Sequence, residues 1–360
     1  MAWLSLLAII LIVFYGTAYI SFSAKETGLF AWISEKSLAR HWHGWLLGLT
    51  IFVVSGVLCF LTDNDVVILT MTPILLHLHG THDIRKLLLI QFAGANTFSV
   101  FSLVSNPTNV IIASRFNIDY IKFIEIMWPI GIIVAVAVFT IGPKFKESIV
   151  LKPPHKTRTS ENLIFSGIGV SCLLILLTTS RYTGLEIWAC VLIILALFIF
   201  RDMLCKSLAH NLKQLPVRAG LIITSGLIAA EALSYFGFTE SMATTLSNQG
   251  FIVAALAIAI ISPLVAALIV NIPMAILFSS ILLYTDFPHE QKIALISLVF
   301  LSSDISTLIF RRASLAGHMW QHMIEQDDGR NISRGYFAKY LAPAGISAML
   351  IGLIFVVLQS

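Results

Sequence analysis

Four short polar runs interrupt apolar stretches of the sequence, and their side chains are the ones most able to do chemistry. Thr62-Asp63-Asn64-Asp65 and Ser105-Asn106-Pro107-Thr108-Asn109 lie in the first half of the chain. The second half holds Asn271-Ile272-Pro273 and the run Ser302-Ser303-Asp304-Ile305-Ser306-Thr307, which is followed by Arg311, Arg312 and Ser314. The carboxylates, amides and hydroxyls of these runs predict the binding of a polar substrate or a coupling ion.

The composition around these runs predicts a membrane protein. Only 12% of the 360 residues are charged and 58% are hydrophobic, whereas soluble domains have about 25% charged residues. A helical crossing needs about 20 apolar residues, so each long charge-free window holds one crossing or several. These windows are residues 3–24, 45–62, 87–114, 162–180, 241–285 and 341–360. The sequence therefore predicts an all-α polytopic membrane protein and excludes a cytosolic globule or a disordered chain.

Other function classes lack their usual sequence signals. The net charge of +4 is not arranged as a basic stripe among aromatic residues, and the four cysteines have no CxxC spacing. No P-loop, GxSxG or GxGxxG pattern is present. We therefore expect no nucleic-acid partner, no metal, no cofactor and no enzymatic activity. A membrane-embedded hydrolase or transferase is the alternative from another class, and it would need a nucleophile–base pair or a bound metal.

Two apolar pairs are predicted to be re-entrant hairpins, because that arrangement gives the strongest charge asymmetry. The pair 45–79 would have its tip at residues 62–65, and the pair 251–285 would have its tip at residues 271–273. Seventeen of the 23 basic residues then share one side of the membrane. By the positive-inside rule that side is the cytoplasm, which places both termini outside a cytoplasmic (inner) membrane. The hairpins then enter from opposite sides, as inverted repeats require.

The predicted domain organisation follows from this topology. The first repeat spans 1–142 with the hairpin 45–79 and a broken helix at 87–115; a cytoplasmic linker spans 143–162; the second repeat spans 163–360 with the hairpin 251–285 and a broken helix at 290–325. A weak sequence echo supports the repeats. The residues around Gly28 resemble those around Gly237, and each glycine precedes its hairpin tip by a similar distance, 36 residues to Asn64 and 34 to Asn271.

The polar run at 105–109 is predicted to break a transmembrane helix. Pro107 removes a backbone donor and disfavours helix at Asn106, and half-helix ends with bare carbonyls could then face an ion. The alternative is a helix that ends near Leu103 and continues into an exit loop. The tips at 62–65 and 271–273 have a similar alternative, an ordinary polar turn at the membrane surface.

The run that ends near Arg311 and Arg312 also has two interpretations. In one, it is a second broken helix whose guanidinium groups face an anion or pair with Asp304 or Asp65, because the planar fork of arginine suits oxyanions. In the other interpretation, residues 294–310 form one continuous helix, and both arginines are positive-inside anchors at the cytoplasmic surface.

In the order of these motifs the chain resembles the ArsB-type arsenite permeases of the ion transporter superfamily, which also contains NhaD-type and dicarboxylate/citrate carriers. The segments that carry the resemblance are Ser23-Ala-Lys-Glu-Thr-Gly-Leu-Phe30, Asn64-Asp65 running into Thr72-Pro73, Ala95-Asn96-Thr97 through Asn109 to Phe116-Asn-Ile-Asp-Tyr120, Val270-Asn271-Ile-Pro273, Ser314 to Trp320, and Ile332 to Lys339. The resemblance begins after the opening helices of that family, which implies a shortened N-terminus. Phe310-Arg311-Arg312-Ala313-Ser314 stands where that family has Thr-Pro-Ile-Gly-Ser, which departs from the pattern of an arsenite carrier.

The resemblance implies a secondary active transporter for a small inorganic oxyanion or an arsenite- or antimonite-like solute, coupled to protons or sodium by alternating access. The alternatives are a sodium- or proton-coupled carrier of carboxylates or other anions, and a non-transporting truncated paralogue. Asn64, Asn106, Asn109 and Asn271 would offer amides to substrate or ion, and Asp65 would carry the coupling proton or cation. The whole candidate set is Thr62, Asp63, Asn64, Asp65, Ser105, Asn106, Pro107, Thr108, Asn109, Asn271, Pro273, Ser303, Asp304, Ser306, Thr307, Arg311, Arg312 and Ser314. The expected partners are a small anionic or neutral oxyacid substrate, the lipid bilayer and a second copy in a homodimer.

Overall fold

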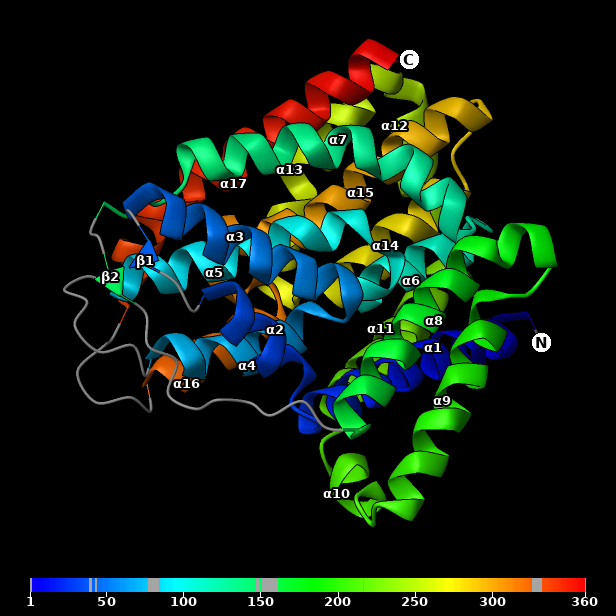
Figure 1. Ribbon diagram of the computed structural model, residues 1–360. Helices are drawn as coiled ribbons and strands as arrows, with labels where there is room; N and C mark the ends of the chain where they lie inside the picture. The colour runs from blue at the N-terminus through cyan, green and yellow to red at the C-terminus, as the bar shows by residue number, and fades with distance from the viewer. Residues whose placement is uncertain are drawn as a thin grey trace.

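The structure is a computed structural model that describes residues 2–38, 41–42, 44–76, 84–146, 149–150, 161–215, 217–325 and 332–359. Within these residues the chain is almost entirely helical (Figure 1). Seven helices are long and apolar enough to cross a membrane, and one further pair, bent by 73°, raises the number to eight if it forms one span. The prediction of an all-α polytopic membrane protein is therefore confirmed.

The first half of the chain contributes the elements up to residue 150. They are α1 (Ala2–Glu26), α2 (Leu29–Leu38), α3 (Gly44–Leu61), α4 (Asn64–Leu76), α5 (Ile84–Phe98), the 3₁₀ turns η1 (Ser99–Phe101) and η2 (Leu103–Ser105), α6 (Pro107–Arg115) and α7 (Tyr120–Ile141). Two short strands, β1 (His41–Trp42) and β2 (Ile149–Val150), pair antiparallel.

The second half supplies the remaining elements. They are α8 (Glu161–Thr183), α9 (Ile187–Leu204), α10 (Leu208–Lys213), α11 (Val217–Tyr235), α12 (Phe238–Gln249), α13 (Phe251–Ile269), α14 (Asn271–Leu283), α15 (His289–Ile309), the 3₁₀ turn η3 (Arg311–Ala313), α16 (Leu315–Glu325) and α17 (Arg334–Gln359). The bent pair is α11 with α12.

Helix boundaries fall at three of the four polar runs and just after the fourth, whose residues 302–307 lie inside α15. The junction between α3 and α4 lies at Thr62 and Asp63, and that between α13 and α14 lies at Val270. Pro107 begins α6 instead of lying in an exit loop. The helix α15 runs without interruption to Ile309, so the alternative of one continuous helix over 294–310 holds to within one residue, and the chain breaks only after it, at η3. Three short helices, α2, α10 and α12, were not predicted as separate elements.

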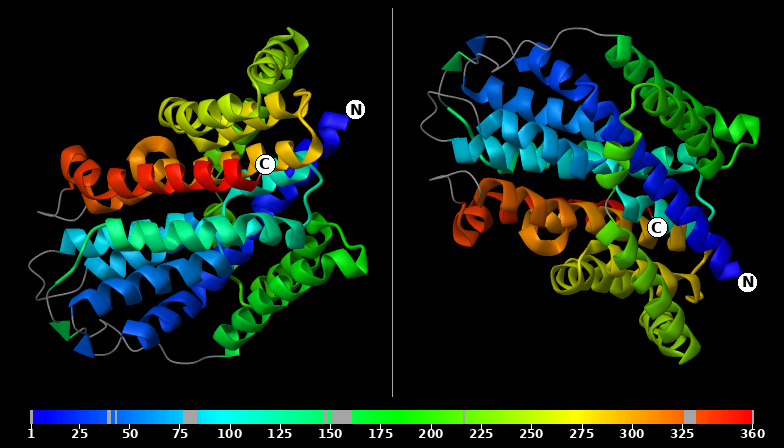
Figure 2. Two further views of the ribbon diagram at one scale, coloured as in Figure 1. Left: turned by 90° about the horizontal axis from the view of Figure 1, so that it is seen from above. Right: turned by 90° about the horizontal axis from the view of Figure 1, so that it is seen from below.

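The two halves pack against each other in a crossed pattern. The helix after the first junction, α4, packs on α16, and the helix after the second junction, α14, packs on α6. Within each half, α3 packs on α5 and α13 packs on α15. Figure 2 shows the same elements from two further sides, and it places the start of α1 and the end of α17 toward the same end of the bundle.

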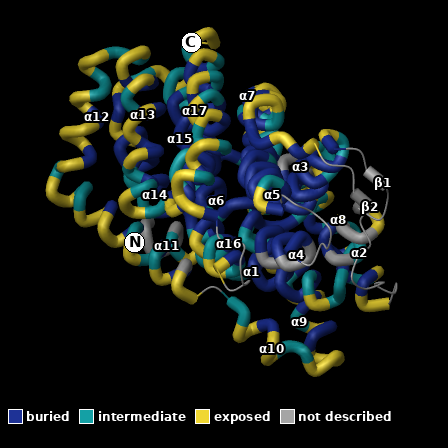
Figure 3. Tube along the Cα trace, turned by 90° about the vertical axis from the view of Figure 1, so that its left-hand side faces the viewer, coloured by how far each residue is buried: buried dark blue, intermediate teal, exposed yellow. Residues whose placement is uncertain are grey.

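Large apolar side chains cover the outer faces of the long helices. Figure 3 shows buried residues at the centre and exposed ones along the outside of helices such as α12, α13 and α17. Leu268 of α13 and Leu358 of α17 are more than four-fifths exposed, at 83% and 81%. Exposed apolar surface on this scale marks contact with a membrane or a partner, and it suits helices that face lipid.

Close contact between α3 and α5 depends on Gly94. A Cβ atom at this position would lie 2.4 Å from the backbone oxygen of Phe52, which cannot rotate away. We expect Gly94→Ala to lower the free energy of unfolding by about 1–3 kcal/mol, as overpacking does. Gly335→Ala is the matched control, because nothing lies within 4 Å of a Cβ there. Denaturant titration of both variants in detergent tests this, and equal stabilities would contradict it.

Candidate functional site

Four helices that are far apart in the sequence begin at one cavity. Their first residues are Asn64 of α4, Pro107 of α6, Asn271 of α14 and Leu315 of α16. The cavity, which we call the junction cavity, is lined by Phe14, Asn64, Asp65, Asn106, Pro107, Asn271, Ile272, Ser314, Leu315 and Ala316. Residues from both hairpin tips and both helix breaks of the sequence analysis thus lie together.

The two helices that follow the junctions start in different ways. Asp63 caps α4, because its Oδ1 accepts a hydrogen bond from the backbone N–H of Asp65 at 2.8 Å. At the other junction Val270 has φ 70° and ψ 159°. This conformation is strained for a β-branched residue, and such strain concentrates at functional sites.

The two helices that follow the breaks start after an extended residue with a polar side chain. Asn106 has φ −147° and its Oδ1 accepts from the backbone N–H of Thr108 at 3.1 Å, with Pro107 in the first turn. Ser314 has φ −138° and its Oγ accepts from the backbone N–H of Gly317 at 3.1 Å. The two breaks therefore share a 3₁₀ turn, an extended residue and a side-chain cap.

The convergence of four helix N-termini adds positive potential at the junction cavity. The first N–H groups of each helix have no partner within the helix, and the N-terminus has the effect of about half a positive charge. Anionic groups bind at such ends. The carboxylate that faces this cavity is Asp65, which is half-buried in the first turn of α4.

The junction cavity is small, but a larger cavity adjoins it. Its volume is about 10 Å³, which is room for about one water molecule. The neighbouring cavity, which we call the access cavity, measures about 420 Å³ and is lined by Phe14, Ala18, Phe22, Lys25, Asp63, Asp65, Val66, Gln214 and Met319. Asp65 and Phe14 line both cavities and therefore lie at the boundary between them.

Asp304 is a fully buried carboxylate beside the junction cavity. Its Oδ1 accepts from the Nδ2 of Asn106 at 2.5 Å, and its Oδ2 lies 3.4 Å from the Nδ2 of Asn109. The Asn109 amide also donates to the backbone oxygens of Ser99 and Ser102, which the break exposes. Asn106 thus connects the wall of the junction cavity to this carboxylate.

Ser303 ties the two helix breaks and the second junction together. Its Oγ receives a hydrogen bond from the Oγ1 of Thr108 at 3.0 Å, and its backbone oxygen receives one from the Nδ2 of Asn271 at 3.1 Å. Several buried polar atoms of this region have no partner among the described residues, namely Asn109 Oδ1, Thr97 Oγ1, Ser102 Oγ and Ser306 Oγ. Buried polar groups are usually satisfied, so this cluster marks a polar site and not a core.

The other predicted residues do not reach the junction cavity through their side chains. Thr62 donates to the oxygen of Leu58, Thr307 to that of Asp304, and Ser105 to those of Ser99 and Ser102. Pro273 packs near Gly226 of α11. The hydroxyls of Thr62, Thr307 and Ser105 thus satisfy local backbone carbonyls.

The interpretation in which Arg311 or Arg312 pairs with Asp304 or Asp65 is wrong. The Nη1 of Arg311 instead donates to the backbone oxygen of Ile332 at 2.8 Å. Both arginines line a separate cavity beyond the end of α15. The reason is that η3 follows the end of α15, two helical turns beyond Asp304, so its side chains lie away from the buried carboxylate.

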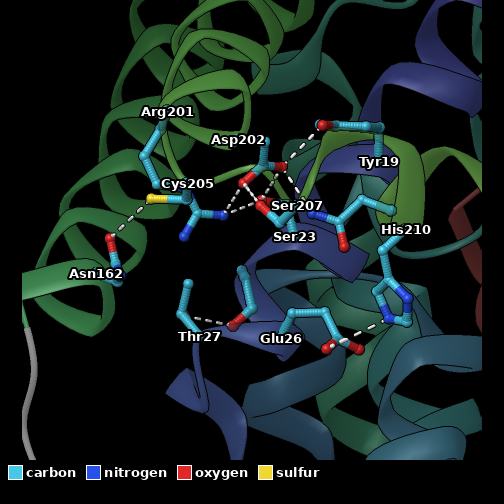
Figure 4. Close-up of polar contacts among 12 residues, drawn as sticks. Tyr19, Ser23, Glu26, Thr27, Asn162, Arg201, Asp202, Cys205, Ser207 and His210 are labelled. Atoms are coloured by element: carbon cyan, nitrogen blue, oxygen red, sulfur yellow. Dashed lines mark hydrogen bonds and ion pairs between the residues drawn. The ribbon is translucent and has the colours of Figure 1, made fainter.

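Another buried carboxylate, Asp202, was not predicted as a site (Figure 4). Its oxygens accept from Tyr19 Oη at 2.7 Å, Ser23 Oγ at 2.8 Å, Asn211 Nδ2 at 2.7 Å and Ser207 Oγ at 3.0 Å. The neighbouring Arg201 forms an ion pair with the same carboxylate. These contacts fasten α1 to α9 and α10, so the Asp202 cluster is a structural anchor.

Some residues of the candidate site have no sequence signal that reveals them. Phe14, Lys25 and Gln214 line the cavities from α1 and from the segment after α10. Asn96, whose Oδ1 lies 3.5 Å from the Nδ2 of Asn64, entered the sequence analysis only through a family resemblance. An apolar or isolated polar residue on a long helix gives no indication of the cavity that it faces.

The fold and the cavities define the class of protein. Long apolar helices, interrupted at a buried polar cavity where helix N-termini meet, are the architecture of secondary membrane carriers. Residues 2–302 match the family model described as a citrate transporter, CitMHS, so the chain belongs to this family. The family indicates a secondary carrier for citrate or other carboxylate-type anions.

The resemblance to the ion transporter superfamily, which also contains citrate carriers, is therefore supported, and the more specific predictions are not. The ArsB-type assignment and the shortened N-terminus are not confirmed, and arsenite as substrate is not supported. The matched residues include both junctions and the first break, and they end just before Ser303 and the second break.

Proposed function

We propose that this protein is a secondary carrier that binds a citrate-like carboxylate anion in the junction cavity and couples its movement to protons or sodium by alternating access. The observation that supports this most is the convergence of four helix N-termini on one cavity. Carboxylates bind at helix N-termini through free N–H groups and the helix dipole. Membership of a citrate transporter family supports the same substrate class.

The size of the junction cavity supports a mechanism with moving parts. At about 10 Å³ it is too small for a carboxylate anion, whereas the access cavity of about 420 Å³ is of ligand size. The helices around the junction cavity therefore separate when substrate enters, in this proposal from the access cavity past Asp65. Alternating access requires a closed state of this kind between two open ones.

Asp65 supplies the link to the coupling ion in this proposal. An ionised carboxylate at the boundary of the two cavities competes with an anionic substrate for the same N-termini. The substrate therefore binds best when a proton or cation has neutralised Asp65. Binding of the two ligands is then reciprocally coupled, as linkage requires.

The second function considered, transport of an inorganic oxyanion, uses the same N-termini, and a substrate panel separates the two. Sealed vesicles that contain the purified protein would be given labelled citrate, succinate, phosphate and arsenite, with imposed pH and sodium gradients. We expect saturable, gradient-driven uptake of a carboxylate. Uptake of phosphate or arsenite alone would overturn the proposed substrate class, and no uptake of any solute would favour a non-transporting paralogue.

Asn271 is expected to matter for substrate affinity. It lines the junction cavity, and its amide is placed by the contact with Ser303. We expect Asn271→Ala to raise the KM for the carboxylate about tenfold, since one hydrogen bond to a charged group contributes roughly 1.5–3 kcal/mol. Ser279→Ala on the same helix is the control, because Ser279 only bonds the oxygen of Ile276. Equal KM values for the two variants would remove Asn271 from the site.

We also propose that the two halves are inverted repeats, with both termini outside and the basic loops in the cytoplasm. The crossed packing of α4 on α16 and α14 on α6 supports the repeats. So do Gly28 and Gly237, which lie in equivalent places between a long and a short helix with φ 81° and 74°. Cysteine labelling from either side of sealed vesicles would test the orientation.

A further inference from the structure

A third cavity lies at the second helix break, and it is rich in arginine. It measures about 290 Å³ and is lined by Ala267, Ile309, Phe310, Arg311, Arg312, Arg334, Phe337 and Ala338. We call it the arginine cavity. Among these described lining residues none is acidic, so three guanidinium groups share the space without a carboxylate in its wall.

Arg311 is built into this cavity and is not a surface anchor. Its side chain is buried, with a residue exposure of 8%, and its guanidinium lies 5.7 Å from the ring centre of Phe337. Nη1 donates to the oxygen of Ile332, but Nε has no partner among the described residues. A buried donor on a charged group costs free energy when it has no hydrogen-bond acceptor.

The backbone holds Arg311 in this position. A Cβ atom at Gly317 would lie 1.8 Å from the backbone oxygen of Arg311, so only glycine lets α16 approach the turn this closely. Arg312 and Arg334 are exposed at the rim. Glu325 is near enough to interact electrostatically with Arg311, and it is not among the residues that line the cavity.

We propose that the arginine cavity binds an oxyanion, namely a carboxylate or a phosphate group. Arginine forks match carboxylate and phosphate oxygens bidentately, and they form stronger hydrogen bonds with them than neutral donors do. The oxyanion is either the transported carboxylate, held next to the junction cavity, or the phosphate of an anionic lipid head group. The first source rests on the proposed function, and the second does not.

The position of the cavity suits both sources. Arg311 lies three residues before Ser314, which lines the junction cavity, so η3 forms part of the boundary between the two cavities. The wall also includes Ala267 of α13, next to Leu268, whose side chain is 83% exposed on the apolar outer face. A basic pocket between membrane helices is a typical site for lipid phosphates.

The test compares Arg311→Gln and Arg334→Gln with Arg218→Gln, an exposed arginine at the start of α11 that lines none of the three cavities. Arg334 is exposed, so its variant reports on the cavity even where Arg311→Gln folds poorly. Citrate binding would be measured by calorimetry in nanodiscs of neutral phosphatidylcholine. Retention of phosphatidylglycerol by detergent-purified protein would be measured by native mass spectrometry.

A carboxylate ligand predicts about tenfold weaker citrate binding in both cavity variants, roughly the effect of one lost charge-assisted contact, and no change in Arg218→Gln. A lipid ligand predicts unchanged citrate binding and loss of bound phosphatidylglycerol in the same two variants. If both variants match Arg218→Gln in both measurements, the arginine cavity is not an oxyanion site. If the arginine cavity proves not to be an oxyanion site but the protein still transports a carboxylate, the proposed function stands. If the two cavity variants lose bound phosphatidylglycerol but the wild-type protein binds no carboxylate, only the proposed function is overturned.

Discussion

Asp65→Asn is expected to abolish gradient-driven accumulation of a carboxylate while leaving exchange of internal for external carboxylate intact. Asparagine is nearly the same size and keeps a polar side chain at the boundary of the junction and access cavities. It cannot be ionised, so the substrate no longer competes with a charge at the four helix N-termini. Binding then persists without a requirement for the coupling ion.

The magnitude follows from the gradient that is imposed. A tenfold proton gradient is worth about 1.4 kcal/mol per proton, so a wild-type carrier accumulates up to about tenfold substrate for each coupled proton. We expect Asp65→Asn to reach only the external concentration. Counterflow in the same vesicles shows that the variant is inserted and functional.

A matched control comes from Asp286, an exposed carboxylate in the turn after α14. Asp286→Asn removes the same charge at a place outside the cavities, and we expect wild-type accumulation. Unchanged accumulation in Asp65→Asn would remove this residue from the coupling mechanism. Loss of exchange together with accumulation would instead make Asp65 a part of the substrate site.

Asp202→Ala is expected to lower the free energy of unfolding by about 3–5 kcal/mol, because it leaves Arg201 buried without its partner. Asp202 is fully buried and Arg201 is 9% exposed, so water cannot replace the ion pair. The substitution also removes the acceptor of Tyr19, Ser23 and Asn211. Three helices, α1, α9 and α10, lose a common anchor.

Ser207→Ala isolates the effect of one donor in the same cluster, because Ser207 contributes a single side-chain hydrogen bond to Asp202 at 3.0 Å. We expect this variant to lose about 1 kcal/mol. Unfolding by denaturant in detergent would be followed for both variants. An Asp202→Ala protein no less stable than Ser207→Ala would show that the cluster contributes little to the fold.

The helix breaks could be predicted from the sequence because local chemistry determines them. Pro107 disfavours helix at Asn106, whose side chain then caps α6, and Asp63 caps α4 at the first junction. The charge distribution then suggested hairpins, whose tips do line a common cavity. Their orientation in the membrane stays a prediction.

Other features depend on contacts between distant residues, so no local pattern reveals them. Arg201 and Asp202 follow an apolar segment, and that position is typical of charges at the membrane surface. The structure instead buries Asp202 against Tyr19, which is 183 residues away in the sequence. The short helices α2 and α12 follow Gly28 and Gly237 and are too short to be recognised by hydropathy. The direction of Arg311 depends on its contact with Ile332, across a segment outside the described residues.

The crossed packing of the hairpins restricts how the molecule can move. Because α4 lies on α16 and α14 lies on α6, pulling the first half away from the second would break both contacts at once. A simple clamshell between the halves is therefore disfavoured. A motion that opens the junction cavity at lower cost would keep α4 with α16 and α14 with α6, and would shift each pair against the helices around it.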